Sequence, residues 1–97
     1  MTITKNQNGS AFTLSVAGRL DTVTSPELEN AIQGLGEATE LTVDFAKLEY
    51  ISSAGLRVLL SAHKNFAKKG GLTIINVNET VLEIFDVTGF KDILNIK

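Results

Sequence analysis

Short runs of alternating apolar residues are separated by helical stripes along most of this chain of 97 residues. Alternation over four to eight residues is typical of a half-buried strand, whereas apolar residues spaced three and four apart indicate one face of a helix. The order read from the sequence is strand, strand, helix, strand, helix, strand, helix, strand. Strands that alternate with helices pair in parallel through crossover connections, so the pattern predicts an α/β fold with a mixed, mostly parallel sheet.

The first two strands are predicted to form a hairpin at one edge of that sheet. The first is a short strand at Thr2–Lys5, and the second alternates apolar with small or polar residues up to Leu20. Asn8-Gly9 lies between them and is a strong signal for a tight turn, since both residues tolerate positive φ. We therefore expect one antiparallel pair before the parallel part of the sheet.

The remaining elements follow from apolar spacing and from residues that start or stop helices. Thr24 as N-cap makes a capping box with Glu27, whereas Ser25 as N-cap places Pro26 at the first helical position. The other predicted elements are a strand at Glu40–Phe45, a helix from Ser52-Ser53 to Lys69, a strand at Leu72–Val77, a short helix capped by Asn78 and ending at Gly89, and a last short strand within Phe90–Ile96. The continuous apolar character of Leu72–Val77 suits a sheet covered on at least part of both faces.

Length and composition exclude several classes of protein. A chain of this length is too short for two cores, so residues 1–97 are expected to form one domain. There is no cysteine, and the one histidine, His63, lies on a helical apolar stripe, where we expect a partly buried structural role. We expect no metal and no cofactor. No apolar run reaches membrane-spanning length and the N-terminus lacks a signal-peptide core, so we expect a cytoplasmic protein without membrane insertion.

Charge is unevenly distributed along the chain. The formal net charge is −2, which argues against direct binding of nucleic acid. Between Glu49 and Glu79 there is no acid, but there are four basic residues: Arg57, Lys64, Lys68 and Lys69. This stretch is either a solvated helix whose lysines complement the helix dipole, or a docking surface with its own sign.

Two hydroxyls stand where the second helix begins, in the run Tyr50-Ile51-Ser52-Ser53-Ala54-Gly55-Leu56-Arg57. The first turn of a helix has free N–H groups and a partial positive charge. A serine there either caps the helix or accepts a phosphate, which these N–H groups tolerate. No glycine-rich phosphate loop and no Ser–His–Asp set accompanies it, so the sequence does not predict an enzyme. A two-component receiver is also disfavoured, because the acidic pair after its first strand is missing.

Several motifs occur in the order and spacing of a known family: Gly18-Arg19-Leu20-Asp21, Thr24-Ser25-Pro26-Glu27-Leu28, Tyr50 to Leu56, Gly70-Gly71, and Leu82-x-x-Phe85-x-x-x-Gly89-Phe90. Over nearly its whole length the chain resembles a STAS domain, and more narrowly the bacterial anti-sigma factor antagonists. The family motif Asp-Ser-[Ser/Thr]-Gly-Leu-Gly falls on residues 52–57. The resemblance therefore implies phosphorylation at Ser53, with Ser52 in place of the usual acid, Ala54 in place of the second hydroxyl and Arg57 in place of the last glycine.

The resemblance implies a phosphorylation-switched protein-binding module that regulates transcription. The unphosphorylated form would sequester an anti-sigma factor with serine kinase activity and so release a sigma factor. A serine phosphatase would reverse the switch, and the free protein would be a monomer. The implied partner-binding residues join the turn after the second strand to the start of the second helix: Asp21, Thr22, Thr24, Ser52, Ser53, Gly55 and Arg57. The alternative is a STAS subunit that is never phosphorylated, in a larger complex such as a lipid transporter.

Overall fold

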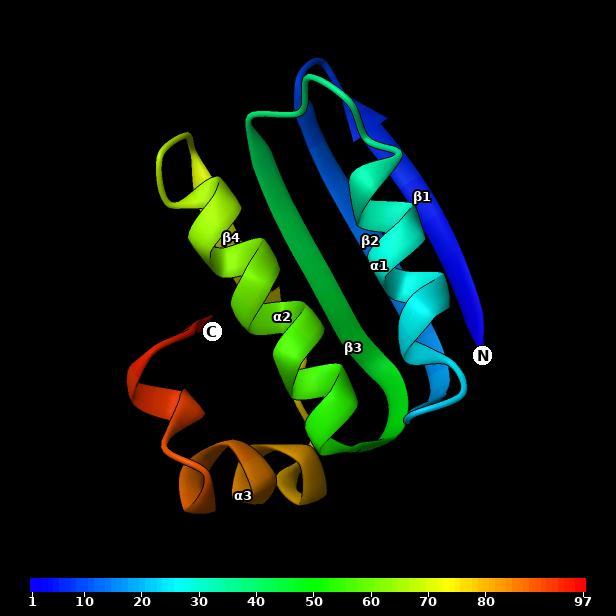
Figure 1. The fold of residues 1–97 in the computed structure, drawn as a ribbon, viewed down its shortest axis with the longest axis vertical. Coiled ribbons are helices and arrows are strands. Elements are labelled where there is room, and N and C mark those ends of the chain that lie inside the picture. The colour runs from blue at the N-terminus through cyan, green and yellow to red at the C-terminus, as the bar shows by residue number, and fades with distance from the viewer.

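The computed structural model describes residues 1–97 and contains five strands and three α-helices in the predicted order (Figure 1). The strands are β1 (Thr2–Asn8), β2 (Ala11–Leu20), β3 (Glu40–Ile51), β4 (Gly71–Ile75) and β5 (Asn95–Ile96). The helices are α1 (Ser25–Gln33), α2 (Ser53–Phe66) and α3 (Glu79–Val87), and a 3₁₀ turn, η1 (Phe90–Asp92), precedes β5.

The five strands form one sheet in sequence order, β1-β2-β3-β4-β5. β1 pairs antiparallel with β2 through the predicted hairpin, and Gly9 in its turn has a φ of +65°. The other three pairs are parallel. The predicted α/β class and mixed, mostly parallel sheet are therefore confirmed.

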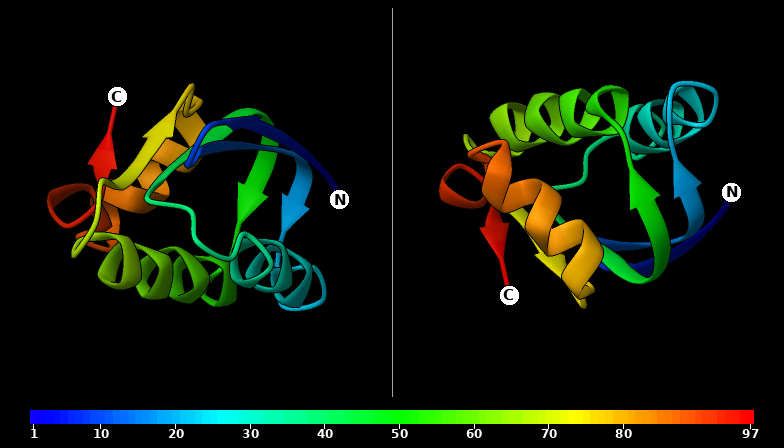
Figure 2. Two further views of the ribbon diagram at one scale, coloured as in Figure 1. Left: turned by 90° about the horizontal axis from the view of Figure 1, so that it is seen from above. Right: turned by 90° about the horizontal axis from the view of Figure 1, so that it is seen from below.

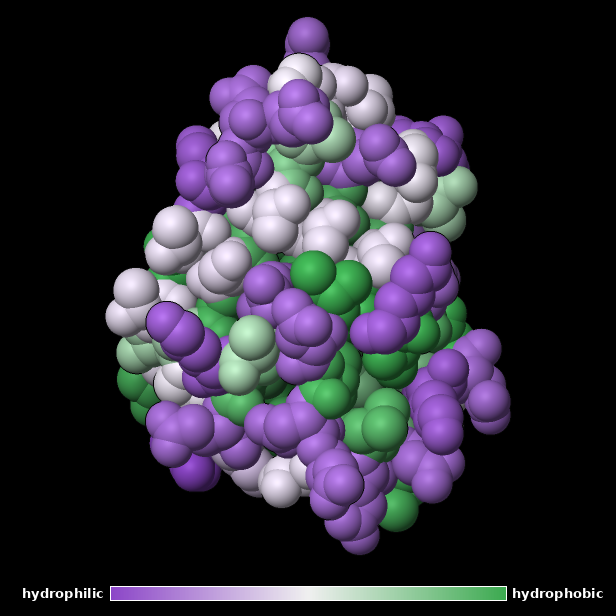
Figure 3. Space-filling model, turned by 180° about the vertical axis from the view of Figure 1, so that it is seen from behind, coloured by the Kyte–Doolittle hydropathy of each residue, from purple (hydrophilic) through white to green (hydrophobic).

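α1 and α2 lie on the same side of the sheet, and α3 lies across one end of it (Figures 1 and 2). Apolar side chains of α1, α2 and α3 meet the inner face of the sheet in one continuous core, which includes Leu28, Phe45, Leu59, Ile74 and Phe85. No helix covers the opposite face of β1, β2 and β3, which Figure 3 shows as a mixed surface with pale and polar residues. Leu72 and Ile74 of β4 face the core, and Thr73 and Ile75 on its other face are half-buried, which agrees with the expected partial cover of both faces at this strand.

β3 runs six residues beyond its predicted end at Phe45. Its inward apolar positions are spaced two apart up to Phe45 and then three apart, at Leu48 and Ile51. Two register shifts against β2, after Ser15 and after Gly18, account for the change. Each bulge adds a residue that breaks the alternation on which the sequence prediction relied.

Other element ends also differ from the prediction, and β1 runs to Asn8 instead of Lys5. α2 ends at Phe66 and continues only as turns to Gly70, and β4 ends at Ile75 because Asn76 adopts a left-handed backbone with a φ of +59°. The predicted cap of α3 is confirmed: Asn78 Oδ1 accepts a hydrogen bond from Val81 N at 2.8 Å. Asn78 Nδ2 also donates to the Leu48 carbonyl at 2.7 Å, which fixes α3 against β3.

Candidate functional site

The two segments predicted to form a docking surface meet at one end of the sheet. Leu20 and Ile51, the last residues of β2 and β3, are register partners. Ser52 N donates to the Leu20 carbonyl at 2.9 Å, so the turn after β2 and the start of α2 lie side by side (Figure 1). The carboxyl ends of neighbouring parallel strands meet at one edge, which is why sequence order alone predicts this juxtaposition.

The two serines at the start of α2 have different environments. Ser53 is the first residue of the helix, and it is exposed. Ser52 occupies the N-cap position, but its side chain makes no capping bond, and its Oγ is buried without any hydrogen-bond partner. The capping interpretation therefore fails for Ser52, and only the Ser53 side chain is presented to solvent.

Gly55 is the third residue of α2, and it is buried against the last residues of β2 and β3. A Cβ placed on Gly55 would lie 2.7 Å from Leu20 Cγ and 2.8 Å from Ile51 Cγ1. Glycine is thus required there for α2 to approach the sheet closely. Its predicted contact with a partner remains a prediction.

The turn from Asp21 to Ser25 is held by its own side chains. Asp21 Oδ1 accepts hydrogen bonds from Val23 N at 3.0 Å and from Thr24 N at 3.1 Å. Thr24 Oγ1 donates to the Arg19 carbonyl at 2.7 Å and accepts from Asp21 N at 2.8 Å. Thr24 is the N-cap of α1, but because its hydroxyl serves the turn, the predicted capping box does not form. The alternative was wrong as well, since Pro26 is the second helical residue.

A shallow hollow of about 390 Å³ lies between α1 and α2 beside this turn. Thr22 and Glu29 line it from one side, and Arg57 and Ser61 line it from α2. Arg57 is exposed one turn after Ser53. The hollow thus contains one cation and one acid, and Ala54, the residue after the exposed serine, also lines it.

Comparison with known proteins agrees with this geometry. The family model described as "Mlab, STAS domain" matches residues 3–95. An anti-sigma-B factor antagonist of Bacillus subtilis is 33% identical over 92 residues, which cover 93% of this chain and 84% of that protein. The chain belongs to the STAS family of anti-sigma factor antagonists.

Solved structures show the same fold for this STAS domain. The crystal structure of an anti-sigma factor antagonist from Mycobacterium paratuberculosis matches with a TM-score of 0.87 at 24% identity, covering 98% of this chain and 83% of that one. The phosphorylated form of the Bacillus cell fate determinant SpoIIAA matches with a TM-score of 0.75 at 16% identity, covering 99% and 91%.

Sequence reasoning missed an apolar side chain at the tip of the turn in this STAS domain. Val23 is 83% exposed in the turn that follows β2. The sequence did contain a signal for this exposed side chain, because an apolar residue stands between two threonines directly after a strand. Arg19 stacks over the Tyr50 ring at 4.6 Å on the same end of the sheet, where the two residues are register partners. Val23, Arg19 and Tyr50 extend the candidate docking surface beyond the predicted residues.

Other features of the STAS domain add no further site here. His63 is half-buried on α2 as predicted, and its Nδ1 is buried without a partner. No group of three or more metal-ligating side chains lies together. None of the helices is both long and apolar enough to cross a membrane.

We predict that Asp21 stabilises this STAS domain in a pH-dependent way. Hydrogen bonds from the backbone of Thr24, then from its side chain and from Val23 N, lower the pKa of Asp21 below its ordinary value of 3.8, against a smaller opposing effect of burial. The stabilisation is present above that value and is lost as the pH falls through the lower folded-state pKa. Asp21→Asn is thus expected to unfold at a lower urea concentration than wild type at pH 7, by a margin that shrinks in acid.

The measurement is urea unfolding followed by circular dichroism at neutral and acidic pH. Asp86→Asn is the control, because the carboxylate of that exposed residue accepts no hydrogen bond within the protein. An equal margin for Asp21→Asn at both pH values would contradict the role of the carboxylate.

Proposed function

We propose that residues 1–97 act as one STAS domain that antagonises an anti-sigma factor. The unphosphorylated domain binds the anti-sigma factor and releases a sigma factor, which then directs transcription. Support comes from the relative of 33% identity, which is named for this activity and matches nearly the whole chain. The proposed activity is binding in the cytoplasm by a monomer, and it involves no catalysis by this chain.

The accessibility of Ser53 is the observation that carries the proposal. A kinase must reach the hydroxyl that it modifies, and Ser53 is exposed whereas Ser52 Oγ is buried. The first turn of α2 has free N–H groups that no side chain caps. A phosphate at Ser53 therefore fits the helix without melting it. The anti-sigma factor would supply the serine kinase activity, and a serine phosphatase would restore the binding form.

The proposed docking surface explains how phosphate would block binding. Val23 offers an exposed apolar side chain in the turn after β2, and Thr22 and Arg57 line the hollow between that turn and the start of α2. A phosphoserine adds a charge of about −1.5 to −2. Packing a partner over that charge requires its desolvation, which is unfavourable unless the partner supplies matching cations.

We do not favour the alternative of a non-phosphorylated subunit in a larger complex. The named relative is an antagonist, and Ser53 is retained and accessible.

The experiment that tests the function is displacement of a sigma factor from its complex with an anti-sigma factor. Purified chain is added to the complex formed by the anti-sigma factor encoded nearest to it, and the released sigma factor is measured by size-exclusion chromatography. Release in proportion to added chain is expected. A complex that stays intact at a large excess of unphosphorylated chain contradicts the proposal.

We further predict that Arg57 stabilises the phosphorylated form. Arg57 is four residues after Ser53 on α2, so its guanidinium lies on the same helical face. Pairing with a phosphate is expected to contribute about 0.5–1 kcal/mol. The measurement is a double-mutant cycle on unfolding free energy that combines phosphorylation with Arg57→Gln.

Lys64→Gln is the matched control, because it removes the same charge from α2 at a position about 16 Å along the helix from Ser53. The coupling with Arg57 should shrink as salt is raised. A coupling of zero at low salt would leave Arg57 as an ordinary surface residue.

A further inference from the structure

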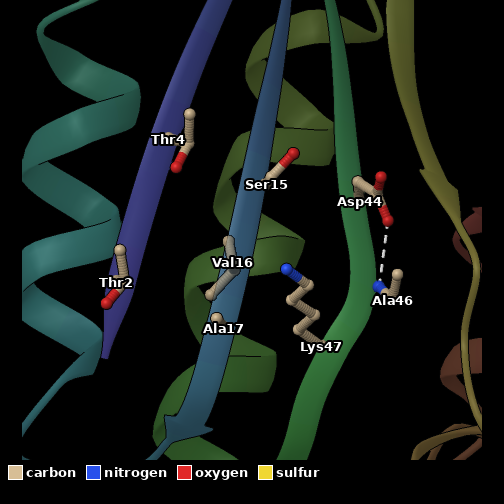
Figure 4. Close-up of a pocket in the computed structure, with 8 residues that line it drawn as sticks. All are labelled: Thr2, Thr4, Ser15, Val16, Ala17, Asp44, Ala46 and Lys47. Atoms are coloured by element: carbon tan, nitrogen blue, oxygen red, sulfur yellow. Dashed lines mark hydrogen bonds between the residues drawn. The ribbon is translucent and has the colours of Figure 1, made fainter.

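A second hollow, of about 320 Å³, lies on the open face of the sheet, opposite the side covered by α1 and α2. It spans β1, β2 and β3 (Figure 4). Its polar side chains are Thr2, Thr4, Ser15, Asp44 and Lys47. The proposed docking surface uses none of these residues, so the hollow needs an explanation of its own.

A β-bulge brings the two charged residues of this hollow to the same face. Asp44 pairs with Ser15 and Lys47 pairs with Ala17, so β3 has three steps where β2 has two. In an unbroken strand, residues three apart point to opposite faces. The bulge cancels that alternation, and both Asp44 and Lys47 line the open face.

The Asp44 carboxylate is held in place from two directions. Its Oδ1 accepts from Ala46 N at 2.9 Å within the bulge, and from Asn76 Nδ2 at 3.1 Å. Asn76 follows β4 and is the non-glycine residue with positive φ. Because both bonds go to Oδ1, Oδ2 faces solvent without a protein partner.

The Lys47 ammonium is also uncompensated. It makes no hydrogen bond within the protein and no ion pair with Asp44, and its side chain extends toward β2 in Figure 4. The hollow therefore offers one fixed acceptor with negative charge and one donor with positive charge, beside three neutral hydroxyls. Apolar atoms, including those of Val16, Ala17 and Ala46, make up the larger part of the exposed lining.

The two unpaired charges define the class of ligand. A simple anion or cation would satisfy one charge and be repelled by the other, and an uncharged polyol would compensate neither. We propose that this hollow binds a small zwitterion of the amino-acid class, with its ammonium on Asp44 and its carboxylate on Lys47. The hydroxyl of Ser15, the register partner of Asp44 on β2, bonds a short polar side chain, and the apolar part of the lining contacts its methylene group.

The test is an NMR titration of the ¹⁵N-labelled chain with L-serine. We expect shifts of the Ser15, Ala46 and Lys47 amides, with a dissociation constant in the millimolar range because the hollow is shallow and open. Glycerate lacks the ammonium, L-serinamide lacks the carboxylate and glycerol lacks both. Each should bind at least tenfold more weakly. Equal shifts with glycerol or with either singly charged analogue would overturn the proposal, as would no shift with L-serine.

Two variants test the residues themselves. Asp44→Asn keeps an oxygen for Ala46 N, and Lys47→Gln keeps a polar chain, so both should fold; each is expected to weaken L-serine binding at least tenfold. Asp86→Asn and Lys68→Gln make the same charge changes at exposed positions outside the hollow and should leave binding unchanged. Unaltered binding in both hollow variants, with the unfolding temperature of each near that of wild type, would show that the zwitterion does not bind there.

Discussion

Replacing Ser53 by alanine is expected to abolish phosphorylation of the chain, whereas Ser52→Ala should leave most of it. Only the Ser53 side chain is exposed at the start of α2, while Ser52 Oγ is buried against the end of the sheet. A kinase active site must surround the acceptor hydroxyl, and burial of Oγ prevents that for Ser52. The measurement is intact-protein mass spectrometry after incubation with the anti-sigma factor and ATP, followed by peptide mapping of the site.

Ser52→Ala is the matched control, because it removes the same hydroxyl from the adjacent residue. It also removes a buried polar atom that has no partner, so the variant should be at least as stable as wild type. One added phosphate is expected in wild type and in Ser52→Ala. A phosphate on Ser53→Ala, or one mapped to Ser52 in wild type, would place the acceptor elsewhere.

Ser53→Asp is expected to weaken binding to the anti-sigma factor at least a hundredfold, which corresponds to about 2.7 kcal/mol. The added carboxylate would have to be desolvated in the interface beside Val23, and leaving a buried charge unpaired typically costs about 2–5 kcal/mol. Folding should change little, since an acid in the first turn of a helix is favourable by about 0.3–1 kcal/mol. Isothermal titration calorimetry gives the affinity, and thermal unfolding gives the stability.

Asn65→Asp is the control for net charge. It adds one negative charge to an exposed position on the same helix, about 18 Å from Ser53. Equal affinity of Ser53→Asp and wild type would mean that the start of α2 lies outside the interface. Equal losses in Ser53→Asp and Asn65→Asp would point to general repulsion between two acidic proteins.

The amino-acid sequence by itself determined the order of elements, the class of sheet and the caps that act locally. Alternation in β2 and the apolar stripes of α1 and α2 depend only on which neighbours share a face, and that is a property of the backbone period. The cap of α3 was equally predictable, because Asn78 bonds an N–H three residues away. The meeting of the β2 and β3 ends followed from parallel pairing.

Only the tertiary structure decided where hydroxyls and charges point when a distant partner competes for them. Thr24 has the sequence of a capping box, but its hydroxyl bonds the Arg19 carbonyl, which the end of β2 brings within reach. Ser52 and Ser53 are adjacent residues of the same type, but the packing of α2 on the sheet buries the Ser52 Oγ and leaves Ser53 exposed.

The bulges of β3 show the same dependence on tertiary structure. Asp44 and Lys47 share a face only because the bulge gives β3 one residue more than β2 between their paired positions. The shift in register also carries the strand past Phe45, where the alternation stops. A bulge is a property of two paired strands, since the extra residue exists only relative to the partner's register. The sequence of one strand therefore shows where apolar residues alternate, but it does not show where pairing with the neighbouring strand introduces a bulge.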